Sequence, residues 1–93
     1  MDANIMICTA ILQSLSGDFG KDYPVNRLTK CIKIAGSVEN CHKAIACLNQ
    51  MSLISVVTTT CFKTGESVSY PVLKENVHKL VERHGAINIL STR

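Results

Sequence analysis

The sequence predicts a single small domain of the α+β class, mainly helical, with its elements in the order α-α-α-β-β-α. Two patterns lead to this expectation. Apolar residues recur at helical spacing in four segments, and a β-branched run with a glycine turn separates the third segment from the fourth. The 93 residues suffice for one modest core, so we expect residues 1–93 to form one domain.

The first helix is predicted from Ala3 to about Ser16, with Asp2 as the residue that caps its first turn. Glycines and aspartates then predict a loop before the next helix. Pro24 favours an extended backbone, and residues 23–25 are a candidate for a short strand. The apolar stripe that should pack this helix onto the domain consists of Ile5, Cys8, Ile11, Leu12 and Leu15.

The second and third helices are joined by a very short turn. Asn26 is the predicted cap of the second helix, which ends at Ala35, because a short side-chain oxygen can accept an otherwise unpaired N–H. Gly36 can adopt the positive φ that ends a helix, and Ser37 can cap the third helix, which extends to Met51. The apolar stripes are Leu28, Cys31, Ile32 and Ala35 in the second helix, and Val38, Cys41, Ala44, Ile45, Leu48 and Met51 in the third. The two helices must therefore cross and bury these stripes, as in a helix-turn-helix unit.

The sequence from residue 26 to residue 72 resembles the winged helix-turn-helix superfamily, in which a recognition helix leads through a Leu-Ile pair into a β-hairpin. The residues that carry the resemblance are Leu28, Ile32, Ala35, Gly36, Ser37, Ile45, Leu48, Leu53 and Ile54. Ser52 stands where the superfamily usually has a glycine before the Leu-Ile pair. The resemblance implies a winged-helix domain, with the third helix as recognition helix and the hairpin as wing. It names no single family.

The predicted hairpin joins a strand at residues 56–62 to a strand at residues 67–72. Residues 63–66 supply the turn, because Gly65 can adopt a positive φ. With a two-residue loop, the opposed pairs would be Cys61 with Val68, Thr59 with Tyr70, and Val57 with Val72. One face of the hairpin is then apolar and the other rich in hydroxyls. The tip carries one positive and one negative charge, so it lacks the strongly basic tip of a wing that grips phosphates.

The last helix is predicted from about Val72 or Leu73 to His84, with Gly85 as its stop. Its apolar side consists of Leu73, Val77, Leu80, Val81 and His84. The tail at residues 86–90 is apolar again, and it either folds back on the core or meets a second subunit. We favour the second alternative, because a free terminal segment is rarely this apolar. Residues 73–93 are then a candidate dimerisation helix and tail, and the chain is expected to form a homodimer.

Five cysteines, without a C-x-x-C pair, predict free thiols in a reducing compartment, and we expect a cytoplasmic protein. Four fall on apolar faces and are expected in the core: Cys8, Cys31, Cys41 and Cys61. Cys47 lies off the apolar stripe of its helix and is the candidate for a redox-active thiol. No spacing of histidine and cysteine suits zinc, so no metal or cofactor is expected. No apolar run is long enough to span a bilayer, and no membrane association is expected.

An enzyme is not expected either. The sequence has no glycine-rich phosphate loop, no ordered Ser-His-Asp set and no paired carboxylates on one helix face. The histidines, His42, His78 and His84, are isolated in the sequence, and such residues are more often structural or solvated than catalytic.

The polar residues of the two-helix unit have the chemistry of a DNA-binding surface. Lysine, asparagine, glutamine and histidine can address base edges in a major groove, and a helix N-terminus can bind a phosphate. Basic residues on the second helix form a strip suited to backbone phosphates. The predicted DNA-binding residues are Arg27, Lys30, Lys33, Ser37, Asn40, His42, Lys43, Gln50 and Lys63. Glu39 opposes this interpretation, because it is acidic where bases would be met.

Two functions remain open. The first is sequence-specific binding of double-stranded DNA by a small winged-helix transcriptional regulator that acts as a dimer. The second is a winged-helix protein-interaction module that binds no DNA, since one fold serves both roles. The basic strip favours the first function. Glu39, the weakly charged hairpin tip and the mild net charge of +3 favour the second. We prefer the first.

Overall fold

The computed structural model describes residues 3–21 and 24–91. In these ranges the chain forms five helices and two strands: α1 (Ala3–Gly17), α2 (Pro24–Ala35), α3 (Val38–Gln50), β1 (Ile54–Thr60), β2 (Ser67–Leu73), α4 (Glu75–His84) and α5 (Ala86–Ser91). The predicted α+β class, mainly helical, is confirmed. The order also agrees with the expectation, except that the last helical region is divided in two at Gly85, where φ is 84°.

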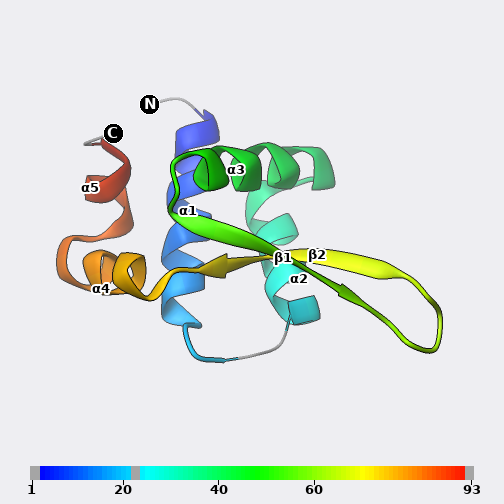
Figure 1. Cartoon of the computed structure of the whole chain (residues 1–93). Helices are drawn as coiled ribbons and strands as arrows, with labels where there is room; N and C mark the ends of the chain where they lie inside the picture. The colour runs from blue at the N-terminus through cyan, green and yellow to red at the C-terminus, as the bar shows by residue number, and fades with distance from the viewer. Residues whose placement is uncertain (1–2, 22–23, 92–93) are drawn as a thin grey trace.

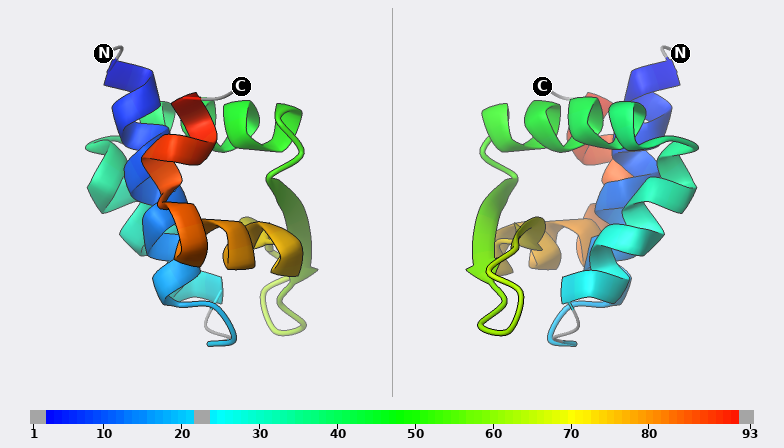
Figure 2. Two further views of the ribbon diagram at one scale, coloured as in Figure 1. Left: turned by 90° about the vertical axis from the view of Figure 1, so that its left-hand side faces the viewer. Right: turned by 90° about the vertical axis from the view of Figure 1, so that its right-hand side faces the viewer.

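Helix α1 is the centre of the packing and contacts each of the four other helices. Figure 1 shows α4 and α5 on one side of α1 and α2 on the other, with α3 lying across them and the hairpin passing in front. The two side views show the β1–β2 hairpin at one side of the helical body, with its loop pointing away from α3 (Figure 2). The hairpin therefore forms an arm beside a helical core.

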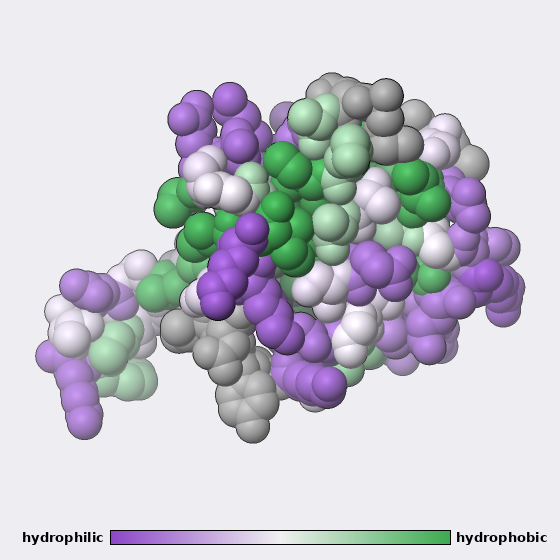
Figure 3. Space-filling model, turned by 180° about the vertical axis from the view of Figure 1, so that it is seen from behind, coloured by the Kyte–Doolittle hydropathy of each residue, from purple (hydrophilic) through white to green (hydrophobic). Residues whose placement is uncertain are grey.

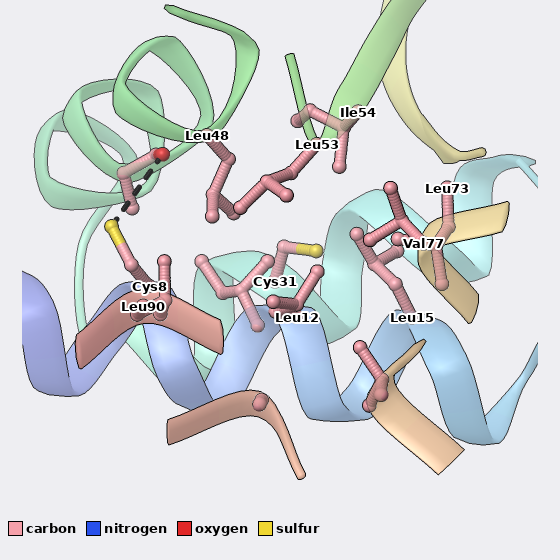
Figure 4. Close-up of a cluster of buried hydrophobic side chains, with 14 of the residues drawn as sticks. Cys8, Leu12, Leu15, Cys31, Leu48, Leu53, Ile54, Leu73, Val77 and Leu90 are labelled. Carbon is pink, nitrogen blue, oxygen red and sulfur yellow. Dashed lines mark hydrogen bonds between the residues drawn. The ribbon is translucent and has the colours of Figure 1, made fainter. Parts of the chain in front are cut away.

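The core consists of aliphatic and cysteine side chains. Its buried members include four residues of the predicted α1 stripe, each at most 4% exposed: Cys8, Ile11, Leu12 and Leu15. Figure 4 shows Leu12 and Leu15 close to Cys31 of α2, Leu48 of α3 and residues from both strands. Cys8 also donates its S–H to the carbonyl oxygen of Ala44 at 3.7 Å, which ties α1 to α3 (Figure 4). The predicted position of Ile5 in this stripe is wrong, since Ile5 is 39% exposed.

The turn between α2 and α3 has the predicted geometry. Gly36 adopts a φ of 86°, and the Ser37 hydroxyl caps α3 by accepting from the N–H of Asn40 at 3.1 Å. The start of α2 differs from the prediction. The helix begins at Pro24, because the fixed φ of proline suits a first helical residue, so Asn26 lies inside the helix and not at its N-cap position. Residues 24–25 are helical, and Tyr23, the rest of the candidate strand, lies outside the described residues.

Helix α3 ends in a Schellman motif that uses a serine in place of glycine. The N–H of Ser52 donates to the carbonyl oxygen of Asn49 at 3.0 Å, and the N–H of Leu53 donates to that of Leu48 at 3.1 Å. Ser52 has a φ of 61°, which is the left-handed conformation the motif requires. Leu48 and Leu53 are both completely buried, so the chain turns directly into the core and enters β1.

The hairpin has a different register from the predicted one. The structure pairs Val57 with Tyr70, Thr59 with Val68, and Thr60 with Ser67. The two-residue loop was wrong: the N–H of Cys61 donates to Glu66 and that of Gly65 donates to Cys61, each at 2.8 Å, which leaves residues 62–65 as the loop. A shift of two residues keeps every strand residue on its predicted face, because side chains alternate. Cys61, however, leaves the sheet and is exposed.

Strand β2 continues to Leu73, and α4 begins only at Glu75. The prediction of a helix start at Val72 or Leu73 was therefore wrong. The backbone of these two residues belongs to the ladder, opposite Ser55 and Ile54 of β1. Leu73 is buried at 6% exposure and serves the core from the end of a strand.

The apolar tail folds back as α5 and packs on α1. Ala86, Ile89 and Leu90 are buried, while Ile87 is 42% exposed. Of the two alternatives for the tail, the structure thus shows packing within the chain for three of these residues. On α4, Val77 and Val81 are likewise buried in the core.

No helix within residues 3–21 and 24–91 has the length and apolar character needed to cross a bilayer.

Candidate nucleic-acid interface

Helix α3 presents a continuous polar face to solvent. Cys41, Ala44 and Leu48 point inward and are completely buried. Besides Val38 at its first position, the exposed residues of the helix are Glu39, Asn40, His42, Lys43, Ala46, Asn49 and Gln50. The helix itself lies at the edge of the molecule (Figure 1), so an extended partner can approach its length.

Two of the predicted α3 residues interact with other residues of the chain. Lys43 pairs with Glu39, with 3.3 Å between Nζ and Oε1, and both side chains are more than 60% exposed. Such an exposed pair contributes only about 0.3–0.5 kcal/mol, so Lys43 can leave it readily. Asn40 donates from Nδ2 to the carbonyl oxygen of Ala35 at 3.4 Å, which places its side chain at the turn before α3.

Arg27 contacts strand β2 of the hairpin and the loop before α2. Its guanidinium donates to the carbonyl oxygen of Pro71 at 3.3 Å and to that of Lys21 at 2.8 Å. It also lies 5.6 Å from the centroid of the Tyr70 ring, within the range of a cation–π interaction. Arg27 therefore joins α2 to β2, and its charge is directed towards the protein.

Lys30 is paired as well, whereas Lys33 is open to solvent. The Lys30 ammonium lies 2.8 Å from Asp18, and this hydrogen bond is the main reason that the pKa of Asp18 is lowered. Within the described residues Lys33 is exposed and forms no ion pair. The structure thus separates the predicted basic strip into one structural arginine, one paired lysine and one available lysine.

The hairpin extends away from the body. The molecule measures 43 Å along its longest axis against 25 and 20 Å along the others, and Figure 3 shows the hairpin projecting from the body at the left. Lys63 is exposed in its loop. One face carries a ladder of hydroxyls, with Thr58 opposite Ser69 at 2.9 Å and Thr60 opposite Ser67 at 3.2 Å between oxygens.

An apolar groove of about 450 Å³ lies between α2, α3 and the hairpin. Its lining residues are Leu28, Ile32, Val38, His42, Ile45, Val56, Ser67, Val68, Ser69 and Tyr70. His42 thus borders the groove from α3, beside the polar face. Val38 was expected in the buried stripe, but it is 54% exposed and lines this groove. The helical spacing of Val38 and Ile45 gave no signal that distinguishes a groove wall from a core.

Sequence reasoning also missed a chain of contacts between α1 and α4. The hydroxyl of Ser16 lies 2.8 Å from Nδ1 of His78, and Nε2 of His78 lies 2.9 Å from Glu82. The Phe19 ring stacks on His78 with 4.1 Å between centroids. Ser16 is only 6% exposed, so its hydroxyl is closed to a substrate, and the contacts fasten α4 onto α1. Sixty-two residues separate Ser16 from His78, and no local pattern could have joined them.

Among the described residues, no group of three or more His, Cys, Asp or Glu side chains is placed to hold a metal ion. Comparisons of the chain with protein-family models, with curated proteins and with solved structures find no match.

Proposed function

We propose that the chain is a winged-helix protein that binds double-stranded DNA sequence-specifically and acts as a small transcriptional regulator. The observation that carries the proposal is the exposed polar face of α3, on a two-helix unit with a capped turn, beside a projecting hairpin. A helix of this kind fits a major groove, about 12 Å wide, in which histidine, lysine, asparagine and glutamine can bind base edges. The hairpin then serves as the wing.

The predicted DNA-binding residues take different roles in this proposal. His42, Lys43 and Gln50 would meet base edges, because they are exposed on α3. Ser37 and Asn40 lie at the N-terminus of the same helix, where backbone N–H groups and the helix dipole favour a phosphate.

Lys33 and Lys63 would meet phosphates directly, and Lys30 would do so after leaving Asp18. Arg27 holds the wing in place through Pro71 and Tyr70 and would contact no phosphate. Three phosphate contacts give an expected slope of about −3 for log K against log salt, which is a modest electrostatic contribution.

The test is the affinity of the chain for a random-sequence duplex at two salt concentrations. Lys33→Ala should weaken binding to every sequence alike and reduce the salt slope by about one unit. Lys79→Ala is the matched control, since Lys79 is an exposed lysine on α4, outside the proposed interface. His42→Ala and Gln50→Ala should instead change the preferred sequence in a selection from random duplexes. A wild-type chain that binds no duplex at low salt would refute the proposal.

We also propose that DNA binding occurs as a homodimer. The C-terminal region would contribute through Ile87, which lies with Met6 and Ala10 beside an open apolar hollow of about 400 Å³ between α1 and α5. Met6 is 58% exposed and Ile87 42% exposed. A two-fold contact at this face would bury the same apolar residues from both copies.

The groove between α2, α3 and the hairpin supports the second function, a protein-interaction module. Val38 and Val56 are each more than 40% exposed at its margin, so apolar side chains of a partner polypeptide would gain burial there. The wild-type chain should then bind no duplex DNA, and Val56→Glu should abolish capture of apolar peptides from a displayed random library while leaving the circular dichroism spectrum unchanged. If no peptide is selected, this second function fails.

A further inference from the structure

The hairpin loop holds a fully exposed aromatic ring. Phe62 has a relative exposure of 104%, so no described residue shields it. The loop around it is held by hydrogen bonds. Cys61 and Glu66 are joined through their backbones at 2.8 Å, Gly65 donates back to Cys61, and the N–H of Glu66 donates to the Thr64 hydroxyl at 3.3 Å. The ring is therefore presented at the end of the arm on a hydrogen-bonded loop.

The residues around Phe62 favour nucleic acid over protein as its partner. An aromatic anchor in a protein interface is usually surrounded by further apolar contacts that exclude water. Here the neighbouring loop and strand residues are Thr60, Cys61, Lys63, Thr64 and Glu66. The exposed valines of the hairpin, Val56 and Val57, lie in the middle of β1 and not in the loop.

The hydroxyls and the shape of the arm agree with this choice, although the tip carries no net charge. The positive charge of Lys63 and the negative charge of Glu66 cancel, so electrostatic attraction alone cannot hold the tip on phosphates. The hydroxyl ladder runs along the strands up to the loop, and each hydroxyl still has bonding capacity for sugar or phosphate oxygens. A minor groove is only about 6 Å wide, so the loop, and not the full width of the ribbon, would enter it.

We propose that the hairpin inserts the Phe62 ring between two base pairs from the minor groove and kinks the duplex. This inference rests on the DNA binding proposed above. Apolar side chains act as such wedges in proteins that bend DNA, because unstacking a base step allows the duplex to wrap more protein surface. Lys63, the next residue, would meet the phosphate beside the opened step. Pyrimidine–purine steps unstack most easily, so the tip should prefer TA or CA/TG beneath it.

The experiment measures DNA bending and affinity together. A duplex of about 30 base pairs carries a donor dye at one end and an acceptor at the other, and a single TA step is moved along an otherwise fixed sequence. The wild-type chain should shorten the end-to-end distance and bind best at one position of the TA step. Phe62→Ala should bind roughly ten- to a hundredfold more weakly, bend the duplex less and lose the preference for that position. Phe62→Leu, which keeps an apolar wedge, should retain most of the bend.

Val57→Ala is the matched control, since it removes an exposed apolar side chain from the same hairpin, away from the tip. A wild-type complex without a bend, or an equal bend with Phe62→Ala, overturns the wedge and leaves DNA binding intact. If the wild-type chain binds no duplex, both proposals fall. If Phe62→Ala converts a dimer to a monomer without DNA, the ring has a protein partner and the wedge is overturned.

Discussion

At the scale of single residues, Ser52 occupies a backbone position that usually requires glycine. Glycine would relieve the strain of the left-handed conformation, which raises the free energy of unfolding by roughly 1–2 kcal/mol. Its extra freedom in the unfolded chain lowers that free energy by roughly 0.5–1 kcal/mol. The Ser52 side chain is exposed, and the bonds that end α3 use backbone atoms only. We therefore expect Ser52→Gly to raise the free energy of unfolding by about 0.5–1 kcal/mol.

Urea unfolding followed by circular dichroism measures this change. Ser55→Gly is the control, because Ser55 lies in β1, where glycine should lower the free energy of unfolding by about 0.5–1 kcal/mol. If both variants are destabilised alike, Ser52 does not carry the strain that its φ of 61° implies.

The five cysteines should differ sharply in reactivity. Cys61 is exposed, and hydrogen bonds from the Thr64 hydroxyl and from the backbone of Thr64 and Lys63 lower its thiol pKa. Burial raises the pKa of Cys31 to about 11 and also raises that of Cys41. A lower pKa gives more thiolate at a given pH, so Cys61 should be alkylated rapidly at neutral pH. Its alkylation rate should rise at a lower pH than that of a free cysteine. The buried thiols should react only on unfolding.

Mass spectrometry after brief iodoacetamide treatment counts the modified thiols. Cys61→Ser should remove the fast phase, and a fast phase that persists in this variant would contradict the assignment. From the sequence, Cys61 was expected in the core and Cys47 was the candidate redox-active thiol, but Cys47 is partly buried against the core. Periodicity predicted Cys8, Cys31 and Cys41 correctly because they lie on regular helices. The fate of Cys61 depended on loop length, which periodicity does not determine.

At the scale of elements, Arg27 and Lys33 share α2 but should affect different properties. Arg27 has two hydrogen bonds and a cation–π contact, all to residues outside α2. Arg27→Ala should therefore lower the free energy of unfolding by about 1–3 kcal/mol and speed amide exchange in β2. Lys33→Ala should change stability by less than about 0.5 kcal/mol, because Lys33 is exposed.

Denaturant unfolding and hydrogen exchange distinguish the two variants. Arg27→Lys tests the geometry, since an ammonium group cannot reproduce the two separated donors and the planar contact with Tyr70. Equal stability of Arg27→Ala and Lys33→Ala would show that the guanidinium contacts do not fasten the hairpin.

Helices were predictable from local patterns, whereas some of their ends were not. The capping serine and the left-handed glycine fixed the α2–α3 turn, because both effects act within four residues. The start of α4 was wrong because Val72 and Leu73 suit a helix or a strand, and pairing with β1 decides between them. The role of Arg27 was also hidden, since Pro71 lies 44 residues away.

At the scale of the whole molecule, one core takes up most of the apolar C-terminus. Of the predicted dimer stripe, Leu73, Val77 and Val81 are buried together with Ile89 and Leu90, whereas Leu80 is 39% exposed. A small chain exposes a large share of its surface, and folding the tail onto α1 is the way this chain enlarges its core. Leu90→Ala should accordingly lower the free energy of unfolding by about 2–5 kcal/mol, as measured by denaturant unfolding. An unchanged stability would show that α5 is dispensable to the core.

Near the C-terminus, Leu80 and Ile87 remain exposed, and the proposed dimer would use Ile87. Ile87 and Met6 border the hollow between α1 and α5, and neither is needed to fill the core. Ile87→Lys should therefore leave the circular dichroism spectrum unchanged but shift the sedimentation coefficient from dimer to monomer at micromolar concentration. Asn88→Lys is the matched control, since it adds the same charge at the neighbouring exposed position of α5.

Dimerisation should couple this face to DNA recognition. Two recognition helices related by a two-fold axis read half-sites roughly 34 Å apart, about one helical turn. Binding of the first half-site then raises the effective concentration at the second, so the monomeric Ile87→Lys variant should lose affinity for a paired site and keep its affinity for a single half-site. If the half-sites are moved apart by half a turn, the wild-type chain should bind the paired site no more tightly than the Ile87→Lys variant does. A wild-type chain that sediments as a monomer and binds both DNA arrangements equally would refute the dimer, and the α1–α5 face would then be ordinary surface.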